Sequence, residues 1–340
     1  MAMPRVLVVD DSAFARTVLS RLMRASGNID VIGTARDGED ALAQIAELDP
    51  DIITLDLTMP RLDGIGVLHA LGGRPRPRVI VVSVSTIDSV VGVEALSLGA
   101  IDLISKPSAL ATDRLYELAD DLVAKVLATI TSPPVVIAAV PPAPLPALRH
   151  RSELVLIGTS TGGPQALTRV LSALPADLAS PVAMVLHIPP GYTEALAKRL
   201  DSGSALEVLE AYDGIELKAG RAVLAKGGMH LRIERQGGRY IGRLAAVPPH
   251  AHIPSVDELF RSGAQAAGSG VLGVVLTGMG DDGLAGARDI AAAGGGLVTE
   301  AASTCVVYGM PRCVAEAGLG ARSAPLDLIH HEIMNHVAPT

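Results

Sequence analysis

Ser160 lies in the stretch whose residue types and spacing bear most directly on chemistry. The run Leu154–Gly163, LVLIGTSTGG, passes from apolar residues into a turn of small residues with Ser160 at its apex. Glycines in such a turn allow the backbone to bend sharply, so that the hydroxyl is presented rather than buried. A serine hydroxyl attacks once a base takes its proton, and that base needs an orienting carboxylate. Ser160 is therefore the candidate nucleophile.

The candidate base and acid follow two later apolar runs. His187 closes the run AMVLHI, and Asp281 and Asp282 follow the run GVVLTGMG. If both runs are strands of one parallel sheet, their ends share an edge with Ser160. The order serine, histidine, acid differs from the order serine, acid, histidine of the α/β-hydrolases. We therefore expect convergent chemistry on a separate fold.

Other interpretations of these residues stay open when each is taken singly. The glycine-rich turn could cradle a phosphate, although no lysine follows the glycines. Ser160 and Asp282 could each be a helix N-cap, and His187 a satisfied histidine at a strand end. Metal binding by the remaining histidines is disfavoured because no carboxylate or cysteine has matching spacing, and Cys305 and Cys313 are expected to be buried thiols. These histidines are His250, His252, His330, His331 and His336.

A second set of polar residues follows apolar runs in the first half of the chain. Asp10 and Asp11 follow RVLVV, Asp56 follows DIITL, and Ser83 and Lys106 lie at the ends of two further runs. Clustered carboxylates repel one another unless a hard cation such as Mg²⁺ lies among them. With Lys106 the cation could stabilise a phosphoryl group moving onto Asp56, and Ser83 could hydrogen-bond the acyl phosphate.

The pattern of elements predicts two α/β domains. In residues 1–128, five β-branched runs alternate with amphipathic stretches, which favours a doubly wound parallel sheet. Residues 129–150 form the predicted linker, because six prolines occur there with no acidic residue. Residues 151–340 repeat the α/β rhythm. Between Gly214 and Leu244 short alternating runs, with Gly237 and Gly238 at a turn, predict an antiparallel hairpin appended to a Rossmann-like sheet.

Composition excludes several classes of protein. The formal net charge is −8, and residues 1–130 hold 12 lysines and arginines against 18 acidic residues, so no nucleic-acid partner is expected. The N-terminal apolar run is too short for a signal peptide, and no apolar run is long enough to span a membrane. We expect a soluble cytoplasmic protein with no membrane insertion.

Residues 4–127 resemble a response-regulator receiver domain. The resemblance rests on Val6–Asp11, on LDLTMPRLDG at Leu55–Gly64 and on the run GAIDLISKP. It implies a flavodoxin-like fold with Asp56 as phosphoacceptor. It further implies that Asp10, Asp11, Asp56 and the Thr58 carbonyl hold Mg²⁺, and that Lys106 and Pro107 are joined by a cis peptide bond.

Residues 152–335 resemble the catalytic domain of chemotaxis protein-glutamate methylesterases. The motifs are GTSTGGPQAL, HIPPGYT, PSVDELFRSGA, LTGMGDDGLAGA and VVYGMPR. The resemblance implies Ser160 as nucleophile, His187 as base, Asp282 as orienting acid, and Thr161 and Met279 beside the oxyanion. The segment Glu300–Ala302 departs from the more polar, acidic run of the family.

The two resemblances imply one activity and its regulation. We expect a hydrolase that demethylates glutamate γ-methyl esters, and deamidates glutamines, on methyl-accepting chemoreceptors, with a chemotaxis histidine kinase as phosphodonor. Our hypothesis is that the unphosphorylated receiver packs over the Ser160 edge and that phosphorylation of Asp56 weakens this packing. The alternatives are a catalytically silent scaffold or phosphate sink and, less favoured, a DNA-binding regulator.

Overall fold

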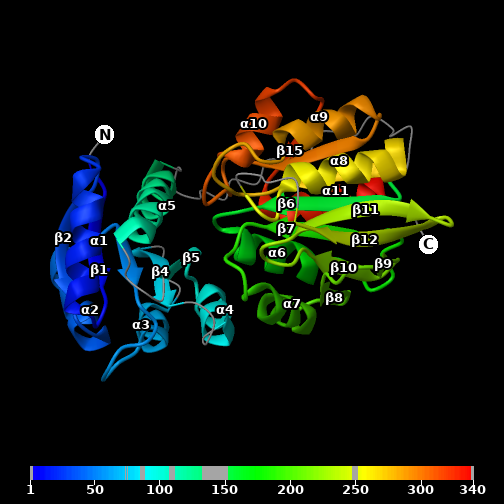
Figure 1. Cartoon of the computed structure of the whole chain (residues 1–340). Coiled ribbons are helices and arrows are strands. Elements are labelled where there is room, and N and C mark those ends of the chain that lie inside the picture. Colours follow the sequence, from blue (N-terminus) through cyan, green and yellow to red (C-terminus); the bar gives the residue numbers. More distant parts are fainter. Residues whose placement is uncertain are drawn as a thin grey trace. The chain divides into compact units, whose positions relative to one another are not determined.

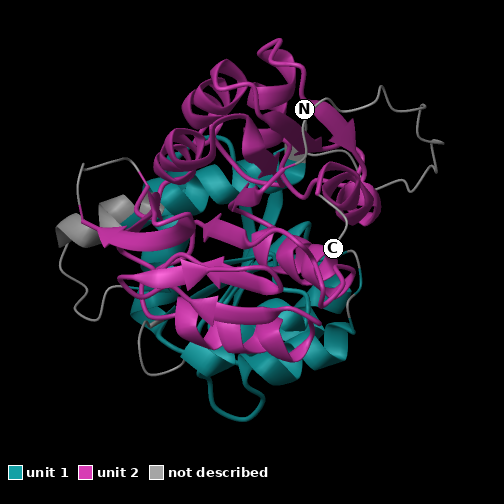
Figure 2. Ribbon diagram, turned by 90° about the vertical axis from the view of Figure 1, so that its right-hand side faces the viewer, with its two compact units in different colours: residues 1–131 teal, residues 132–340 magenta. Residues whose placement is uncertain are grey.

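The computed structural model divides the chain into two compact units, residues 1–131 and 132–340 (Figures 1 and 2). The described residues are 3–72, 74, 76–84, 89–106, 112–131, 152–246 and 252–337. Residues 132–150 of the predicted linker and Pro107, with its predicted cis bond, lie outside them. The first positions assigned to the linker, 129–131, belong to the last turn of helix α5.

The first unit is a doubly wound parallel sheet, as predicted. Its strand order β2-β1-β3-β4-β5 is that of flavodoxin-like proteins. Helices α1 and α5 pack on one face, where Leu19, Met23 and Leu122 are buried against the strands, and α2, α3 and α4 pack on the other. The elements are β1 (Arg5–Val9), α1 (Ala13–Ala25), β2 (Asp30–Ala35), α2 (Gly38–Leu48), β3 (Ile52–Leu55), α3 (Gly64–Leu71), β4 (Arg78–Val84), α4 (Ser89–Ser97), β5 (Asp102–Lys106) and α5 (Thr112–Thr131).

The second unit contains a seven-stranded parallel sheet of order β15-β14-β13-β6-β7-β10-β8 and a three-stranded antiparallel sheet of order β11-β12-β9. The elements up to the hairpin are β6 (Leu154–Thr159), α6 (Gly163–Ser172), β7 (Val182–Leu186), α7 (Thr193–Ser202), β8 (Glu207–Glu210), β9 (Ile215–Leu217), β10 (Arg221–Leu224), β11 (His230–Gln236) and β12 (Arg239–Ala245). The later elements are α8 (Val256–Ala267), the 3₁₀ turn Gly268–Gly270, β13 (Val271–Val275), α9 (Leu284–Ala292), β14 (Gly296–Glu300), α10 (Met310–Glu316), β15 (Arg322–Ala324) and α11 (Leu326–His336).

The hairpin turn at Gly237 and Gly238 is confirmed, since β11 and β12 pair across it with both glycines at positive φ. The placement of RAVLAKGG in the antiparallel appendage is wrong. Its strand β10 instead pairs in parallel with β7 and β8. The physical reason is burial, because Ala222, Val223 and Leu224 are all 0% exposed and require a sheet covered on both faces.

Both faces of the large sheet are covered by helices. Helices α8, α9 and α10 pack on the face whose core includes Leu154, Leu156 and Phe260. Helix α6 contacts both α7 and α11, and these three helices lie on the other face. Figure 1 shows α8 running beside β6 and the β11–β12 hairpin. The strands therefore bury both sets of side chains and end at one edge, where loops hold the polar residues.

Candidate functional sites

The Ser160 turn is anchored to the neighbouring strand end. Ser160 follows β6, and its backbone N–H donates to the carbonyl of Thr277 at 3.0 Å. The hydroxyl of Thr159 donates to the same carbonyl at 2.7 Å. Gly163 N donates to the carbonyl of Ser160 at 2.7 Å, which closes the turn into α6. These bonds hold Ser160 at a defined position, and the residue as a whole is 8% exposed.

Glycine is required at position 162. Gly162 has a φ of +81°, and a Cβ there would lie 2.7 Å from the Cβ of Val306. It is also the N-cap of α6, and no side chain caps that helix. The alternative reading of Ser160 as a helix N-cap is thus excluded, as is that of Asp282, because Gly283 is the uncapped N-cap of α9.

His187 lies one residue beyond β7, which pairs in parallel with β6. Its Nε2 lies 2.8 Å from Oδ2 of Asp282. Its Nδ1 is buried and has no hydrogen-bond partner among the described residues. When Nε2 carries the proton and donates it to the carboxylate, Nδ1 presents a lone pair that can accept a proton.

The carboxylate of Asp282 lies at the N-terminus of helix α8, although Asp282 itself precedes helix α9 in the sequence. Its carboxylate accepts the hydroxyl of Ser255 at 2.9 Å and the backbone N–H groups of Val256 at 2.7 Å and Asp257 at 3.0 Å. Burial alone disfavours the charged carboxylate, but the hydrogen bond and charge of His187, followed by these N–H groups, lower the pKa of Asp282 well below its usual range. Asp282 is therefore ionised and oriented towards the histidine.

Asp257 completes this arrangement, although the sequence analysis gave it no role. Its Oδ1 accepts the N–H groups of Gly283 at 2.9 Å and Gly286 at 2.7 Å, and its side chain is buried. Asp257 thereby binds the beginning of helix α9, which follows Asp282 in the sequence. The only signal in the sequence is its place in the PSVDELF motif.

His252 is a second residue that the sequence analysis did not place here. Its ring stacks on His187, with centroids 4.2 Å apart and an interplanar angle of 16°. Among the described residues, no histidine belongs to a group that could hold a metal ion. His250 lies outside the described residues, His330 and His331 contact each other, and His336 hydrogen-bonds the carbonyl of Glu332.

The loop that carries Met279 is packed against the serine. A Cβ on Gly278 would lie 2.9 Å from the Cβ of Ser160 and 2.4 Å from the sulfur of Met310. Thr161 is 1% exposed, and its carbonyl accepts the Thr277 hydroxyl at 2.9 Å. Both residues expected beside the oxyanion thus flank the Ser160 turn.

Glu300, the last residue of β14, has a buried carboxyl group close to the Ser160 turn. It accepts the N–H of Thr277 at 2.8 Å and the hydroxyl of Thr304 at 2.9 Å. Burial raises the pKa of Glu300 to about 7, although both hydrogen bonds oppose the shift. Because Thr277 also anchors Ser160 and Thr159, Glu300 supports the nucleophile turn through one intermediate residue.

The first unit brings its polar residues together at the carboxyl edge of its sheet. Lys106 Nζ lies 2.5 Å from Oδ2 of Asp10 and 2.6 Å from Oδ2 of Asp56, and all three side chains are buried. Asp11 is exposed beside them, and Ser83 is 2% exposed at the end of β4. Thr58 is exposed, and its N–H donates to Asp56 at 3.4 Å.

This acidic pocket has the donor set of a hard divalent cation. Ligand oxygens of Asp10, Asp11 and Asp56 all lie within 4.8 Å of one another. Burial raises the pKa of Asp10, against the opposing charge and hydrogen bond of Lys106. Three carboxylates and one ammonium leave a charge that a divalent ion would balance, so the residues present fit Mg²⁺.

Comparison with known proteins decides the family. The CheB methylesterase family model matches residues 155–333, and that of the response regulator receiver domain matches residues 6–119. Protein-glutamate methylesterase/protein-glutamine glutaminase 5 of Myxococcus xanthus is 54% identical over an alignment of 344 positions, which covers 98% of each chain. The chain belongs to the CheB methylesterase family.

Further CheB relatives extend the match. The protein-glutamate methylesterase/protein-glutamine glutaminase of Symbiobacterium thermophilum is 43% identical, with 98% of this chain and 97% of that protein covered. The crystal structure of the Thermotoga maritima CheB methylesterase catalytic domain is 38% identical, with a TM-score of 0.54. It covers 55% of this chain and 99% of the solved one. Both resemblances found in the sequence are thus confirmed at the level of family and fold. Within the described residues, no helix combines the length and apolar character needed to cross a membrane.

Proposed function

We propose that this CheB-family chain hydrolyses γ-methyl esters of glutamate, and deamidates glutamine, on the cytoplasmic helices of methyl-accepting chemoreceptors. The observation that carries the proposal is the hydrogen bond between His187 Nε2 and the ionised Asp282, which leaves Nδ1 to act as a base beside the Ser160 turn. The names of the relatives, each a methylesterase and a glutaminase, support the same pair of activities.

The reaction follows from the roles that these groups can take. Nδ1 of His187 takes the hydroxyl proton of Ser160 as Oγ attacks the ester carbonyl carbon. The tetrahedral intermediate collapses with proton return from His187 to the leaving oxygen, and methanol departs; from glutamine, ammonia departs. A water molecule then gives a proton to His187 and attacks the acyl-serine. When the second tetrahedral intermediate collapses, His187 returns this proton to Oγ, which restores Ser160 and releases a glutamate side chain.

The oxyanion needs donors that are in place before the reaction. Backbone N–H groups near Thr161 and Met279 are our candidates, because both residues flank the Ser160 turn and the Gly278 backbone lies against Ser160. Nucleophile–base hydrogen bonds often tighten only when substrate is bound. We therefore expect the substrate ester to bring Ser160 Oγ into line with Nδ1.

The receiver unit would regulate this activity through Asp56. We assign Asp56 as the phosphoacceptor, Lys106 and Ser83 as groups that bind phosphoryl oxygens, and a chemotaxis histidine kinase as the donor. Asp10, Asp11, Asp56 and the Thr58 carbonyl would hold Mg²⁺, which when bound neutralises charge on the phosphoryl oxygens. Lys106 already contacts two of these carboxylates and would move to the phosphoryl group.

Methanol release from methylated receptor membranes tests the proposal. The wild-type chain should release methanol, and Ser160→Ala should release none above background. Ser172→Ala, which alters an exposed serine at the end of α6, is the matched control and should be active. A small-molecule phosphodonor should raise the rate of the wild type but not of Asp56→Asn. A wild-type chain that accepts phosphate yet releases no methanol would instead be a scaffold or phosphate sink.

A further inference from the structure

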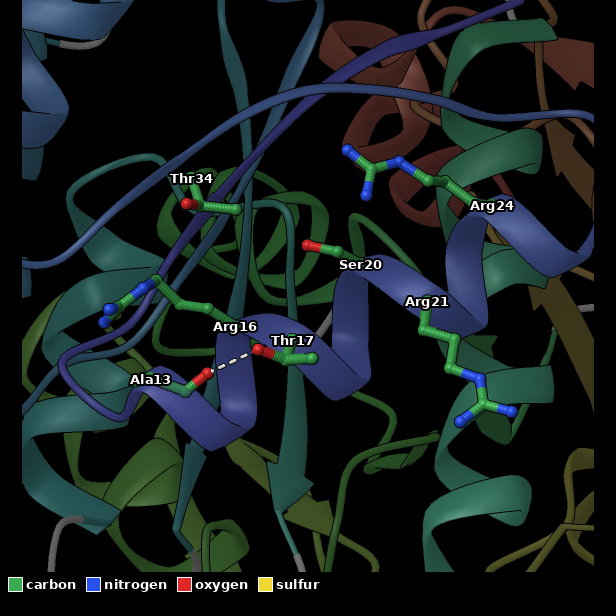
Figure 3. Close-up of a pocket in the computed structure, with 7 residues that line it drawn as sticks. All are labelled: Ala13, Arg16, Thr17, Ser20, Arg21, Arg24 and Thr34. Carbon is green, nitrogen blue, oxygen red and sulfur yellow. Dashed lines mark hydrogen bonds between the residues drawn. The ribbon is translucent and has the colours of Figure 1, made fainter.

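Helix α1 bears an arginine-lined groove that neither site described above uses. The groove has a volume of 560 Å³. Figure 3 shows Ser20 and Thr34 between the guanidinium groups of Arg16 and Arg24. Thr34 comes from β2, and the other lining residues belong to α1. They are Ala13, Arg16, Thr17, Ser20, Arg21, Arg24 and Thr34.

The arginines of the groove have no direct carboxylate partner among the described residues, although the charge of Arg16 contributes to the lowered pKa of Asp40. Among the residues that the structure describes, no carboxylate forms an ion pair with any of its three arginines. Other arginines of this unit do lie against carboxylates, with Arg36 and Arg61 near Asp37 and Arg76 near Asp51. Three arginines without a close ion pair on one helix stand out in a unit with an acidic excess and attract anions.

Two of the guanidinium groups are held in place by backbone carbonyls. Arg16 Nη1 donates to Asp10 O at 2.7 Å and to Asp11 O at 3.0 Å. Arg24 Nη2 donates to Val31 O at 2.9 Å. Each guanidinium has five N–H donors, so several remain for a ligand.

A hydroxyl in the groove also lacks a partner. Ser20 is 4% exposed, and its Oγ has no hydrogen-bond partner among the described residues. A buried hydroxyl without a partner is unfavourable, and a ligand oxygen that reached it would relieve that cost. The Thr17 hydroxyl, by contrast, donates to the carbonyl of Ala13 at 2.8 Å (Figure 3).

We propose that this groove is a binding site for a small polyphosphate, either an inorganic chain or the phosphates of a nucleotide. Guanidinium forks bind phosphate oxygens in pairs, which a single lysine amine cannot do. The volume is that of a small-molecule site rather than of a protein-docking surface. Arg16 and Arg24 are about 12 Å apart along the helix axis, and their long side chains can converge on a phosphate chain between them. Among the described residues that line the groove none is aromatic, so the phosphates supply the contacts that the two ligands share.

Isothermal titration calorimetry of the full chain with tripolyphosphate and with ATP tests this site. EDTA is present, so that no divalent ion bridges phosphate to the acidic pocket. We expect saturable binding of one ligand, weakened at least about tenfold in Arg21→Gln/Arg24→Gln, because two of the three positive charges that line the groove are lost. Arg16 is left intact because it also holds the Asp10 and Asp11 carbonyls. The matched control is Arg74→Gln/Arg288→Gln, which removes the same charge from exposed arginines elsewhere and should bind within about twofold of wild type.

The ligand series separates the possible outcomes. Equal affinity for tripolyphosphate and ATP supports a site that binds the phosphate chain alone. A higher affinity for ATP supports a nucleotide as the natural ligand. Orthophosphate binding as tightly as tripolyphosphate would mean an adventitious ion only and would overturn the proposal. Absence of saturable binding, or equal weakening in the control variant, would also overturn it. An oligoglutamate peptide that competes as strongly as tripolyphosphate would replace the polyphosphate site with a protein-docking surface.

Discussion

Asp257 and Asp282 each bind the chain segment that carries the other. Asp282 accepts the N–H groups of Val256 and Asp257 at the beginning of α8, while Asp257 accepts those of Gly283 and Gly286 at the beginning of α9. Each carboxylate thus lies at the positive end of a helix dipole. The candidate orienting acid is therefore positioned by two helices at once.

Replacing Asp282 with asparagine should lower kcat by about 10³- to 10⁴-fold and leave KM nearly unchanged. The amide keeps the size of the side chain but loses the charge that stabilises the imidazolium form of His187. Steady-state methanol release measures both constants. Asp281→Asn alters the exposed neighbour and should retain activity within about twofold. An equal fall of kcat in the two variants would contradict a catalytic role for Asp282.

Replacing Asp257 with alanine should lower the free energy of unfolding by about 2–4 kcal/mol, because two backbone N–H groups in a buried region lose their acceptor. kcat should fall more than substrate affinity, since Asp282 loses its support. Urea denaturation and methanol release measure the two effects. Asp257→Asn, which keeps an oxygen acceptor, should restore part of both, and Asp289→Ala, in an exposed ion pair, should cost under about 1 kcal/mol. Full activity of Asp257→Ala would limit Asp257 to a structural role.

Replacing Gly278 with alanine should displace the nucleophile turn. The new Cβ would lie 2.9 Å from the Cβ of Ser160 and 3.0 Å from its N, so the turn must shift. A shift of about 1 Å can cost about 10²-fold in rate. Methanol release measures the loss, and circular dichroism verifies the fold. Gly203→Ala, where the nearest atoms are 3.9 Å from the new Cβ, should be fully active.

Replacing Glu300 with glutamine should remove a pH dependence of stability. Burial raises the pKa of Glu300 to about 7, so the native chain retains a proton that the unfolded chain has lost between about pH 4.5 and pH 7. Its contribution to stability is therefore greatest below this window and is lost as the pH rises through it. Between about pH 5 and pH 8, wild type should lose roughly 2–3 kcal/mol relative to Glu300→Gln. Denaturation curves at several pH values measure the difference, and parallel pH profiles would contradict it.

Replacing Lys106 with methionine should make the receiver unit dependent on magnesium. Asp10 and Asp56 are buried against the Lys106 amine, and without it their charges lack a cation. The variant should unfold at a lower temperature than wild type in EDTA, and MgCl₂ should raise its Tm more than that of wild type. Differential scanning calorimetry measures the Tm of each protein in EDTA and in MgCl₂. Lys198→Met, from an exposed pair on α7, should show the wild-type response to magnesium. Identical magnesium shifts in all three proteins would place the ion elsewhere.

Much of the fold could be predicted because local patterns agree with tertiary structure. The five strands of the first unit follow β-branched apolar runs, and Gly237 and Gly238 supply the two positive φ angles that a tight hairpin turn requires. Strand β10 was assigned to the wrong sheet because its short run, Arg221–Leu224, fits either type of sheet. Only burial between β7 and β8 distinguishes them.

The residue types and motifs of the sequence by themselves determined the family, the two α/β units and the candidates Ser160, His187, Asp282 and Asp56. Each candidate follows an apolar run, and the ends of parallel strands share one edge. Tertiary structure alone decided how these groups are supported. The contact of His252 with His187, the exchange between Asp257 and Asp282, and the burial of Glu300 behind Thr277 join residues far apart in the chain. Their hydrogen bonds and pKa shifts depend on distance and burial, which sequence spacing does not encode.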